Sequence, residues 1–233
     1  MRSIWLFIVL LCAACGPYKQ DGNPKADQRT KHLFYPQFSN GPSPAILIIP
    51  ENDLIARKLT QAGYVAMSMK YGEANLKDRD VEKLERIKNR VSENFAFLKA
   101  QPGVDPKRIG VVGISFGGLF VTYLASRPDA TGLRGAIIYY GVHDVPEDIK
   151  NLRVPVLVFQ GDTDSFGFMP RAQAMQKIAQ EHKKQFDLVI YKNAGHGFGL
   201  LGANRDPGDR AATEDSWNKM MYFLDSHLKQ NNP

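Results

Sequence analysis

The sequence has little cysteine and no hydrophobic run long enough to cross a membrane. Only Cys12 and Cys15 occur among the 233 residues, and both lie near the N-terminus. A domain that follows them has no internal thiol pair for a disulfide, no thiol nucleophile and no cysteine ligand for a metal. Its stability therefore has to come from a hydrophobic core, for which a chain of this length with 43% apolar residues is sufficient.

Segregated charge is also lacking. The formal net charge is +6, but lysine and arginine alternate with aspartate and glutamate, as in residues 77–90. The sequence contains no arginine-rich arm, no set of zinc ligands and no ladder of aromatic residues. This pattern favours an ordinary solvated surface over a nucleic-acid site. We expect no nucleic-acid partner and neither a metal nor an organic cofactor.

The first 15 residues have the pattern of an export signal. Arg2 supplies a positive start, residues 4–11 form an apolar core, and two alanines precede Cys15. The core is too short for a membrane span, which needs about 20 apolar residues. We therefore expect this signal to be cleaved rather than to remain as a membrane anchor.

The segment Leu11-Cys12-Ala13-Ala14-Cys15-Gly16 resembles the lipobox of bacterial lipoproteins. The resemblance implies that Cys15 carries lipid and becomes the mature N-terminus, held at the outer membrane or the periplasmic face of the cell envelope. Cys12 departs from the pattern, because the family usually has leucine there. A secreted or periplasmic form without lipid is the alternative.

Two segments follow the signal. Residues 16–30 are rich in glycine, proline, lysine and aspartate and predict a flexible tether, and residues 31–230 predict one domain. In that domain short apolar runs alternate with helical periodicities, which is typical of a largely parallel α/β sheet with helices on both faces. The expected strands are 32–37, 45–49, 64–69, 108–114, 133–140, 154–160 and 186–191. The expected helices are 53–62, capped by Asp53, and 78–100, 117–126, 170–182 and 211–228.

A glycine-rich turn joins one of these strands to the following helix. Residues 113–118 read Gly-Ile-Ser-Phe-Gly-Gly, which matches G-x-S-x-G between a strand and a helix. This is the context of a nucleophile elbow, in which a strained turn exposes the serine hydroxyl above the sheet. The sequence therefore predicts Ser115 as a nucleophile.

A serine hydroxyl needs an adjacent base, and imidazole has a suitable pKa. His196 follows the last predicted strand in a loop of small residues, and we expect it to be that base. His143 also follows a strand end and remains an alternative base or a pocket residue. The other three histidines begin an outer strand or lie near helix ends.

The base in turn needs a carboxylate that holds its tautomer. Asp162 and Asp164 both follow a buried strand, and we favour Asp164, with Asp162 as the alternative; the unused aspartate should bond the backbone of its own turn. The order Ser, Asp, His is that of α/β-hydrolases. For the oxyanion that forms during attack, we expect the backbone N–H of Phe116 as one donor and that of Glu51 or Asn52 as the other.

Three segments carry a resemblance to a known family. Residues 104–110 (Val-Asp-Pro-Lys-Arg-Ile-Gly), the G-x-x-D pattern after the 154–160 strand, and Gly195-His196-Gly197-Phe198 resemble the dienelactone hydrolase family. The resemblance covers most of residues 32–230. It implies an α/β-hydrolase fold, hydrolysis of small esters or lactones, and catalytic roles for Ser115, Asp164 and His196. The sequence has no insertion after the expected strand 133–140, which predicts little or no lid.

The sequence departs from the named dienelactone enzymes, which have cysteine where this chain has Ser115. The loop at residues 50–53 is also shorter than usual, and the path from Asp164 to Pro170 is longer. Dienelactone specificity therefore does not follow. A thioesterase, an acyltransferase, a peptidase of the prolyl oligopeptidase type and a non-catalytic envelope binding protein remain alternatives.

Overall fold

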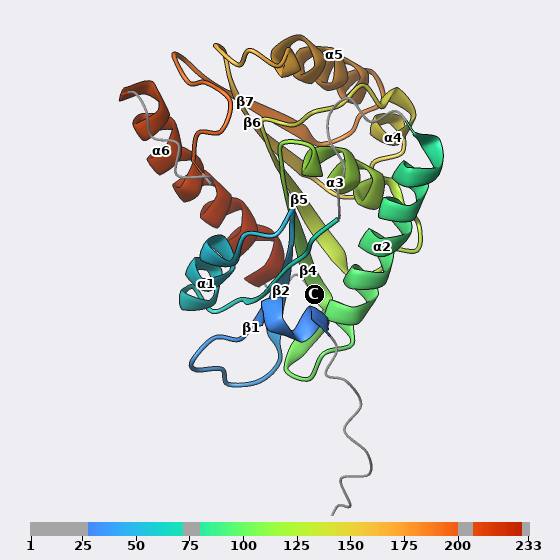
Figure 1. Cartoon of the computed structure of the whole chain (residues 1–233), viewed down its shortest axis with the longest axis vertical. Coiled ribbons are helices and arrows are strands. Elements are labelled where there is room, and N and C mark those ends of the chain that lie inside the picture. The colour runs from blue at the N-terminus through green and yellow to red at the C-terminus, as the bar shows by residue number, and fades with distance from the viewer. Residues whose placement is uncertain (1–27, 72–79, 200–206, 230–233) are drawn as a thin grey trace, which may run out of the picture.

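The computed structural model describes residues 28–71, 80–199 and 207–229 and has a seven-stranded sheet at its centre (Figure 1). The strand order is β1-β3-β2-β4-β5-β6-β7, with β1 antiparallel to β3 and every other pair parallel. The strands are β1 (Leu33–Phe34), β2 (Ser43–Ile49), β3 (Val65–Ser68), β4 (Val104–Ile114), β5 (Leu133–Tyr139), β6 (Val156–Gly161) and β7 (Phe186–Tyr191). The predicted α/β class with a mostly parallel sheet is confirmed.

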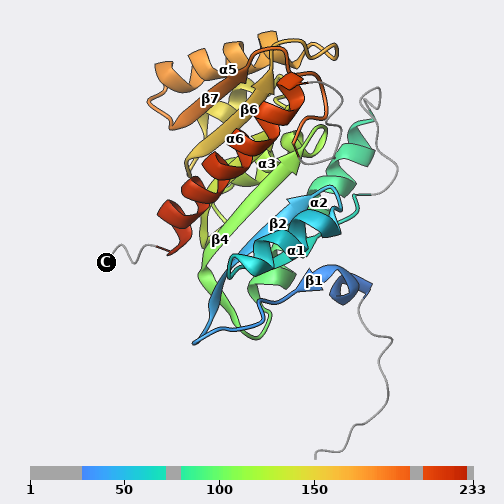
Figure 2. The same ribbon diagram turned by 90° about the vertical axis from the view of Figure 1, so that its left-hand side faces the viewer.

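Helices cover both faces of this sheet (Figures 1 and 2). The helices are α1 (Asp53–Gln61), α2 (Val81–Lys99), α3 (Gly117–Ser126), α4 (Pro146–Lys150), α5 (Phe168–Glu181) and α6 (Pro207–Leu224). One buried cluster joins the sheet to α2, α3, α4 and α5, and the other joins it to α1 and α6. Because both faces are covered, β2 is buried along its whole length, as its continuous aliphatic run predicts.

The helix ends follow local capping chemistry. The side chain of Asn52, and not the expected Asp53, caps α1 by accepting a hydrogen bond from the Ile55 N–H at 3.1 Å. Asp80 caps α2 in the same way, so this helix begins at Val81 rather than at residue 78. Asp53 is consequently released from capping and faces other partners.

Other boundaries differ from the predicted ones. The expected outer strand shrinks to the two residues of β1, and a 3₁₀ turn, η1 (Gln28–His32), precedes it. This turn includes residues 28–30, which the sequence placed in the tether. The short helix α4 was not predicted. The closing helix starts at Pro207 and continues into a π-helical turn, η2 (Asp225–Lys229).

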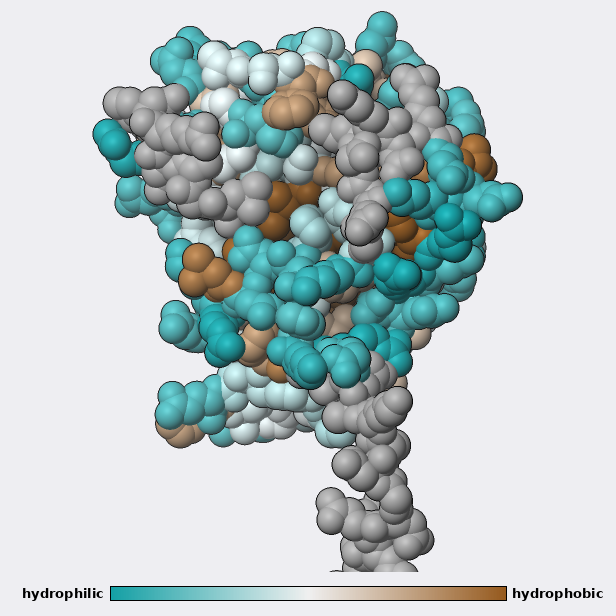
Figure 3. Space-filling model, in the orientation of Figure 1, coloured by the Kyte–Doolittle hydropathy of each residue, from teal (hydrophilic) through white to brown (hydrophobic). Residues whose placement is uncertain are grey.

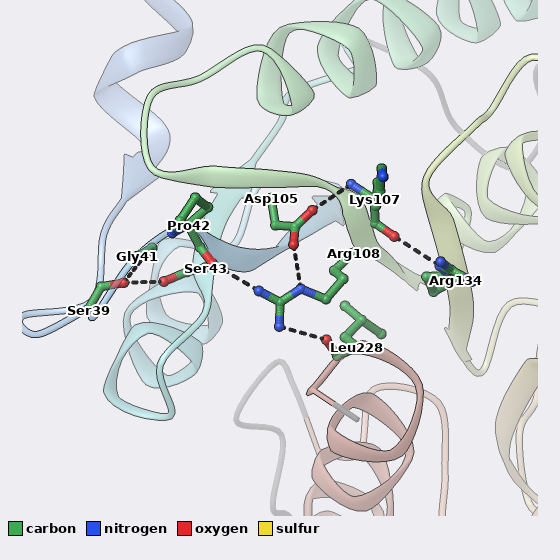
Figure 4. A network of polar contacts seen from close by, with 9 residues as sticks. All are labelled: Ser39, Gly41, Pro42, Ser43, Asp105, Lys107, Arg108, Arg134 and Leu228. Atoms are coloured by element: carbon green, nitrogen blue, oxygen red, sulfur yellow. Dashed lines mark hydrogen bonds and ion pairs between the residues drawn. The ribbon is translucent and has the colours of Figure 1, made fainter. Parts of the chain in front are cut away.

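A polar network fixes the start of β4 (Figure 4). Asp105 accepts hydrogen bonds from the Arg108 Nε at 2.7 Å and from the Lys107 N–H at 2.9 Å. The guanidinium of Arg108 also donates to the carbonyl of Pro42 at 2.9 Å and to that of Leu228 at 3.4 Å. One side chain therefore ties β4 to the segment before β2 and to η2. This is a structural reason for the Asp-Pro-Lys-Arg segment that contributed to the family resemblance.

The face of the molecule that is turned to the viewer in Figure 1 is mostly hydrophilic, and its larger hydrophobic patches lie near the centre of that face (Figure 3). No helix within the described ranges is long and apolar enough to cross a membrane. The predicted export signal, Cys15 and nearly all of the predicted tether lie outside the residues that the structure describes.

Candidate active site

The strand β4 ends in a sharp turn that carries Ser115. Its φ is +52°, a left-handed conformation that costs energy for a residue with a side chain. The turn is closed by hydrogen bonds from the Ser115 N–H to the Tyr139 carbonyl and from the Gly118 N–H to the Ser115 carbonyl, both at 2.9 Å. The hydroxyl is thereby held above the carboxyl end of β4, as a nucleophile elbow requires.

The glycines of the turn are needed for space. A Cβ on Gly117 would lie 2.1 Å from the carbonyl oxygen of Ile49, at the end of β2. A Cβ on Gly118 would lie 2.2 Å from the carbonyl oxygen of Gly141, in the segment after β5. The turn can therefore pack between its neighbours only without side chains at these two positions.

Three side chains from separate loops meet at the turn. The Ser115 Oγ lies 2.9 Å from the His196 Nε2, and the His196 Nδ1 lies 2.9 Å from the Asp164 Oδ2. A carboxylate can only accept a hydrogen bond, so Nδ1 of His196 carries the proton and donates it to Asp164. Nε2 is then free of hydrogen and accepts from the serine hydroxyl. The structure brings together the three residues singled out from the sequence, with the tautomer that deprotonation of Ser115 needs.

The carboxylate of Asp164 is fully buried and well supplied with donors. It accepts hydrogen bonds from the Gln160 Nε2 and from the Phe166 N–H, both at 2.9 Å, in addition to that from His196. Burial alone raises the pKa of this carboxyl, but the three hydrogen bonds outweigh it and the pKa is lowered. Asp164 therefore stays ionised beside the imidazole.

The alternative carboxylate, Asp162, bonds to backbone and not to the His196 ring. Its side chain is exposed and accepts a hydrogen bond from the backbone N–H of Asn193 at 2.7 Å. It thus links the loop after β6 to the loop that carries His196. The predicted bond within its own turn is replaced by one that joins two neighbouring loops.

Aromatic rings surround His196. The centroids of Phe166, Tyr140 and Phe168 lie 4.5, 4.7 and 5.7 Å from that of the imidazole, with Phe168 stacked on it. Phe168 is fully buried, whereas the Phe166 side chain is 53% exposed. The rings restrict the orientation of the imidazole, and Phe166 offers an exposed apolar surface beside it. Sequence reasoning did not single out these residues, because aromatic residues near strand ends usually belong to the core.

The rival histidine, His143, makes no contact with Ser115 that would let it act as base. It lies between the rings of Phe116 and Phe168, with centroid distances of 5.3 and 5.2 Å. Burial, with a contribution from the charge of Arg171, lowers its pKa to about 4. It is therefore neutral at pH 7.

The predicted oxyanion donors lie around the same turn. Phe116 follows Ser115 directly and is the residue before α3. The second loop, residues 50–52, follows Ile49, whose carbonyl packs against Gly117. Glu51 and Asn52 are thus placed next to the elbow by the end of β2. Their side chains point to other partners, so any contribution to an oxyanion hole comes from backbone N–H groups.

Residues 32–228 match the dienelactone hydrolase family. The chain belongs to this family. As a member it is an ester-cleaving hydrolase. In the part of the chain that the structure describes, no group of three or more His, Cys, Asp or Glu side chains is placed to hold a metal ion.

Two curated relatives are similar over most of the chain. A Bradyrhizobium protein named as a probable 2-oxo-3-(5-oxofuran-2-ylidene)propanoate lactonase is 24% identical, covering 89% of this chain and 93% of its own length. A Methylorubrum extorquens protein named as a carboxymethylenebutenolidase is 27% identical, covering 77% and 71%. In each case the similarity extends over most of both proteins.

Solved structures share the fold. The dienelactone hydrolase-like phosphotriesterase P91 from metagenomic libraries superimposes with a TM-score of 0.70 at 24% identity, covering 84% of this chain and 91% of P91. Esterase 2 of Thermogutta terrifontis, with propionate bound, superimposes with a TM-score of 0.65 at 16% identity, covering 82% and 88%. At these identities the similarity establishes the α/β-hydrolase fold alone.

Proposed function

We propose that this protein hydrolyses small carboxylic esters or lactones through an acyl-serine intermediate. The observation that carries the proposal is the continuous hydrogen-bonded series from Ser115 through His196 to Asp164, with 2.9 Å at both steps. Ser115 therefore has a base within hydrogen-bond distance, and Asp164 holds that base in the tautomer that can accept the serine proton. The family membership supports an ester or lactone as the bond that is cleaved.

In the first half of the proposed reaction the Ser115 hydroxyl attacks the carbonyl carbon of the substrate. His196 accepts the serine proton at Nε2, and the ionised Asp164 stabilises the resulting imidazolium. The carbonyl oxygen becomes an oxyanion, which the Phe116 N–H and a backbone N–H of Glu51 or Asn52 stabilise. His196 then gives its proton to the leaving alcohol, and the acyl group remains on Ser115.

In the second half, water replaces the alcohol. His196 takes a proton from the water, whose oxygen attacks the carbonyl carbon of the acyl-serine. The bond between that carbon and the Ser115 Oγ then breaks, His196 returns the proton to Oγ, and the free acid leaves. For a lactone, acid and alcohol stay in one molecule. The exposed ring of Phe166 beside His196 supports substrates with a flat or apolar group near the scissile bond.

The decisive experiment measures the intact mass of residues 16–233 after exposure to a fluorophosphonate, for the wild type and for Ser115→Ala. We expect one adduct on the wild type and none on the variant, with unchanged far-UV circular dichroism. Release of free acid from esters, rather than transfer of the acyl group to added alcohols or amines, separates hydrolysis from acyl transfer. A folded wild type that takes no label would contradict the proposal and favour a binding protein.

For the N-terminus, we propose that Cys15 is lipidated and tethers the domain to the cell envelope. The support is the Leu-Cys-Ala-Ala-Cys sequence at residues 11–15. The test is detergent phase separation after expression of the full chain in a bacterial host. The wild type should partition into the detergent phase, and the Cys15→Ser variant into the aqueous phase. Equal partition of both would contradict lipidation.

A further inference from the structure

The loop that follows β2 carries two carboxylates on either side of the candidate oxyanion donor. Glu51 and Asp53 flank Asn52, and the three residues lead from the end of β2 into α1, whose first residue is Asp53. Like charges this close together repel each other, and such repulsion would displace the backbone between them. The loop therefore needs a cation or hydrogen-bond donors to keep its position beside the elbow.

His32, at the end of η1, lies between these carboxylates. Its Nδ1 is 3.2 Å from each oxygen of Asp53, and its Nε2 is 3.2 Å from the Oε2 of Glu51. The second pair is close enough for an ion pair, although its atoms are not aligned for a hydrogen bond. The ring thus reaches both carboxylates at once, with Nδ1 toward Asp53 and Nε2 toward Glu51.

The C-terminal end of β3 supports the same arrangement. Ser68 donates a hydrogen bond to the Asp53 Oδ1 at 2.6 Å, and the Lys70 Nζ lies 3.3 Å from the Glu51 Oε1. Each carboxylate is thus held from two sides, by His32 and by a residue at or just after the end of β3. Two segments far apart in sequence, the end of η1 and the end of β3, thus converge on one three-residue segment.

We infer that His32 is a positioning residue, which holds the Glu51–Asp53 loop so that a backbone N–H there meets the substrate oxyanion. The inference rests on the proposed function. His32 touches neither Ser115 nor His196, and it acts only through the loop. Since oxyanion donors act on charge that develops in the transition state, loss of His32 affects turnover more than substrate binding.

The test compares His32→Gln with the wild type in steady-state ester hydrolysis. Glutamine keeps one donating nitrogen and loses the second, and the pocket of about 500 Å³ that His32, Glu51 and Ser68 line gives it room. We expect kcat to fall by about 10- to 100-fold with KM within about twofold of the wild type. His182→Gln, at an exposed histidine after α5, is the matched control and should leave both constants unchanged.

A second readout separates positioning from general damage. A trifluoromethyl ketone forms a tetrahedral oxyanion with a serine nucleophile, so its inhibition constant should rise in parallel with the fall in kcat. If His32→Gln does not fold, Ser68→Ala removes a hydrogen bond to the same loop and should shift kcat and the inhibition constant in the same directions, by less.

Two results would overturn the inference: an unchanged kcat, whether or not KM rises, or a lowered kcat with an unchanged inhibition constant. The outcome for the proposed function is separate. A wild type that hydrolyses no ester contradicts both proposals. If the wild type is active and His32→Gln has the same kcat, only the role of His32 is contradicted.

Discussion

Replacing Asp164 by asparagine tests the site most directly, because the two side chains have the same shape and differ in hydrogen-bonding capacity. The carboxylate accepts three hydrogen bonds, from His196 and Gln160 at Oδ2 and from the Phe166 N–H at Oδ1. An amide has one accepting oxygen and one donating nitrogen. Whichever way the introduced amide is turned, at least one of the three donors loses its acceptor.

Two consequences follow for Asp164→Asn. If the amide nitrogen faces His196, the imidazole is held with its proton on Nε2 and cannot accept the serine proton, which lowers kcat by about 10³- to 10⁴-fold. In either orientation an unsatisfied donor in this buried site costs about 1–3 kcal/mol. For a chain of this size that corresponds to a fall in Tm of about 2–12 °C.

The assay combines hydrolysis of a chromogenic acetate ester with thermal unfolding. Asp162→Asn is the control. Among the described residues, the exposed Asp162 carboxylate accepts a hydrogen bond only from the backbone N–H of Asn193, so this variant should leave kcat within about twofold of the wild type. The reasoning would be refuted by an Asp164→Asn variant within about tenfold of the wild-type kcat, or by an equal loss in Asp162→Asn.

Two further predictions concern stability. Gly118→Ala places a Cβ 2.2 Å from the Gly141 carbonyl oxygen and should lower the free energy of unfolding in urea by about 3 kcal/mol. Gly167→Ala is the comparison, because Gly167 has a φ of +74° but open space around it, and it should cost about 1 kcal/mol. Equal costs would contradict the close approach at Gly118. Burial raises the pKa of Asp148, so the folded state disfavours its charged form and this carboxyl contributes less stability as pH rises through its folded pKa. The free energy of unfolding of Asp148→Asn should therefore increase relative to that of the wild type as the pH rises from about 4 to 7. A difference that stays constant or shrinks with rising pH would contradict the burial effect.

Much of the fold was predictable because its elements are specified locally. The aliphatic run of residues 45–49 indicates a strand covered on both faces, and the apolar stripe of residues 81–98 indicates a helix. Gly113 to Gly118 predicts the elbow because few other patterns pair a serine with glycines between a strand and a helix. The boundaries were less predictable, since Asn52 and Asp53 are both good caps and their neighbours decide between them.

The order of candidate residues along the chain predicted Ser115, Asp164 and His196, but only the tertiary structure could bring each within 2.9 Å of the next. The choice between Asp162 and Asp164 depended on which side of the loop after β6 faces His196, and spacing does not encode that direction. The rings around His196 are contributed by the segment after β5, by the loop after β6 and by the start of α5, and their convergence depends on the neighbouring positions of β5 and β6 in the sheet.

For His32 too, the sequence supplied the residue type and the tertiary structure decided its contacts. In the sequence it is an ordinary residue before an outer strand, far along the chain from Ser115. The antiparallel pairing of β1 with β3 places it beside the loop after β2, where it meets two carboxylates. Local composition and periodicity thus determined the elements and the residue types of the site. Strand order and the packing of loops at one edge of the sheet decided which side chains meet, because contacts between distant segments depend on the path of the whole chain.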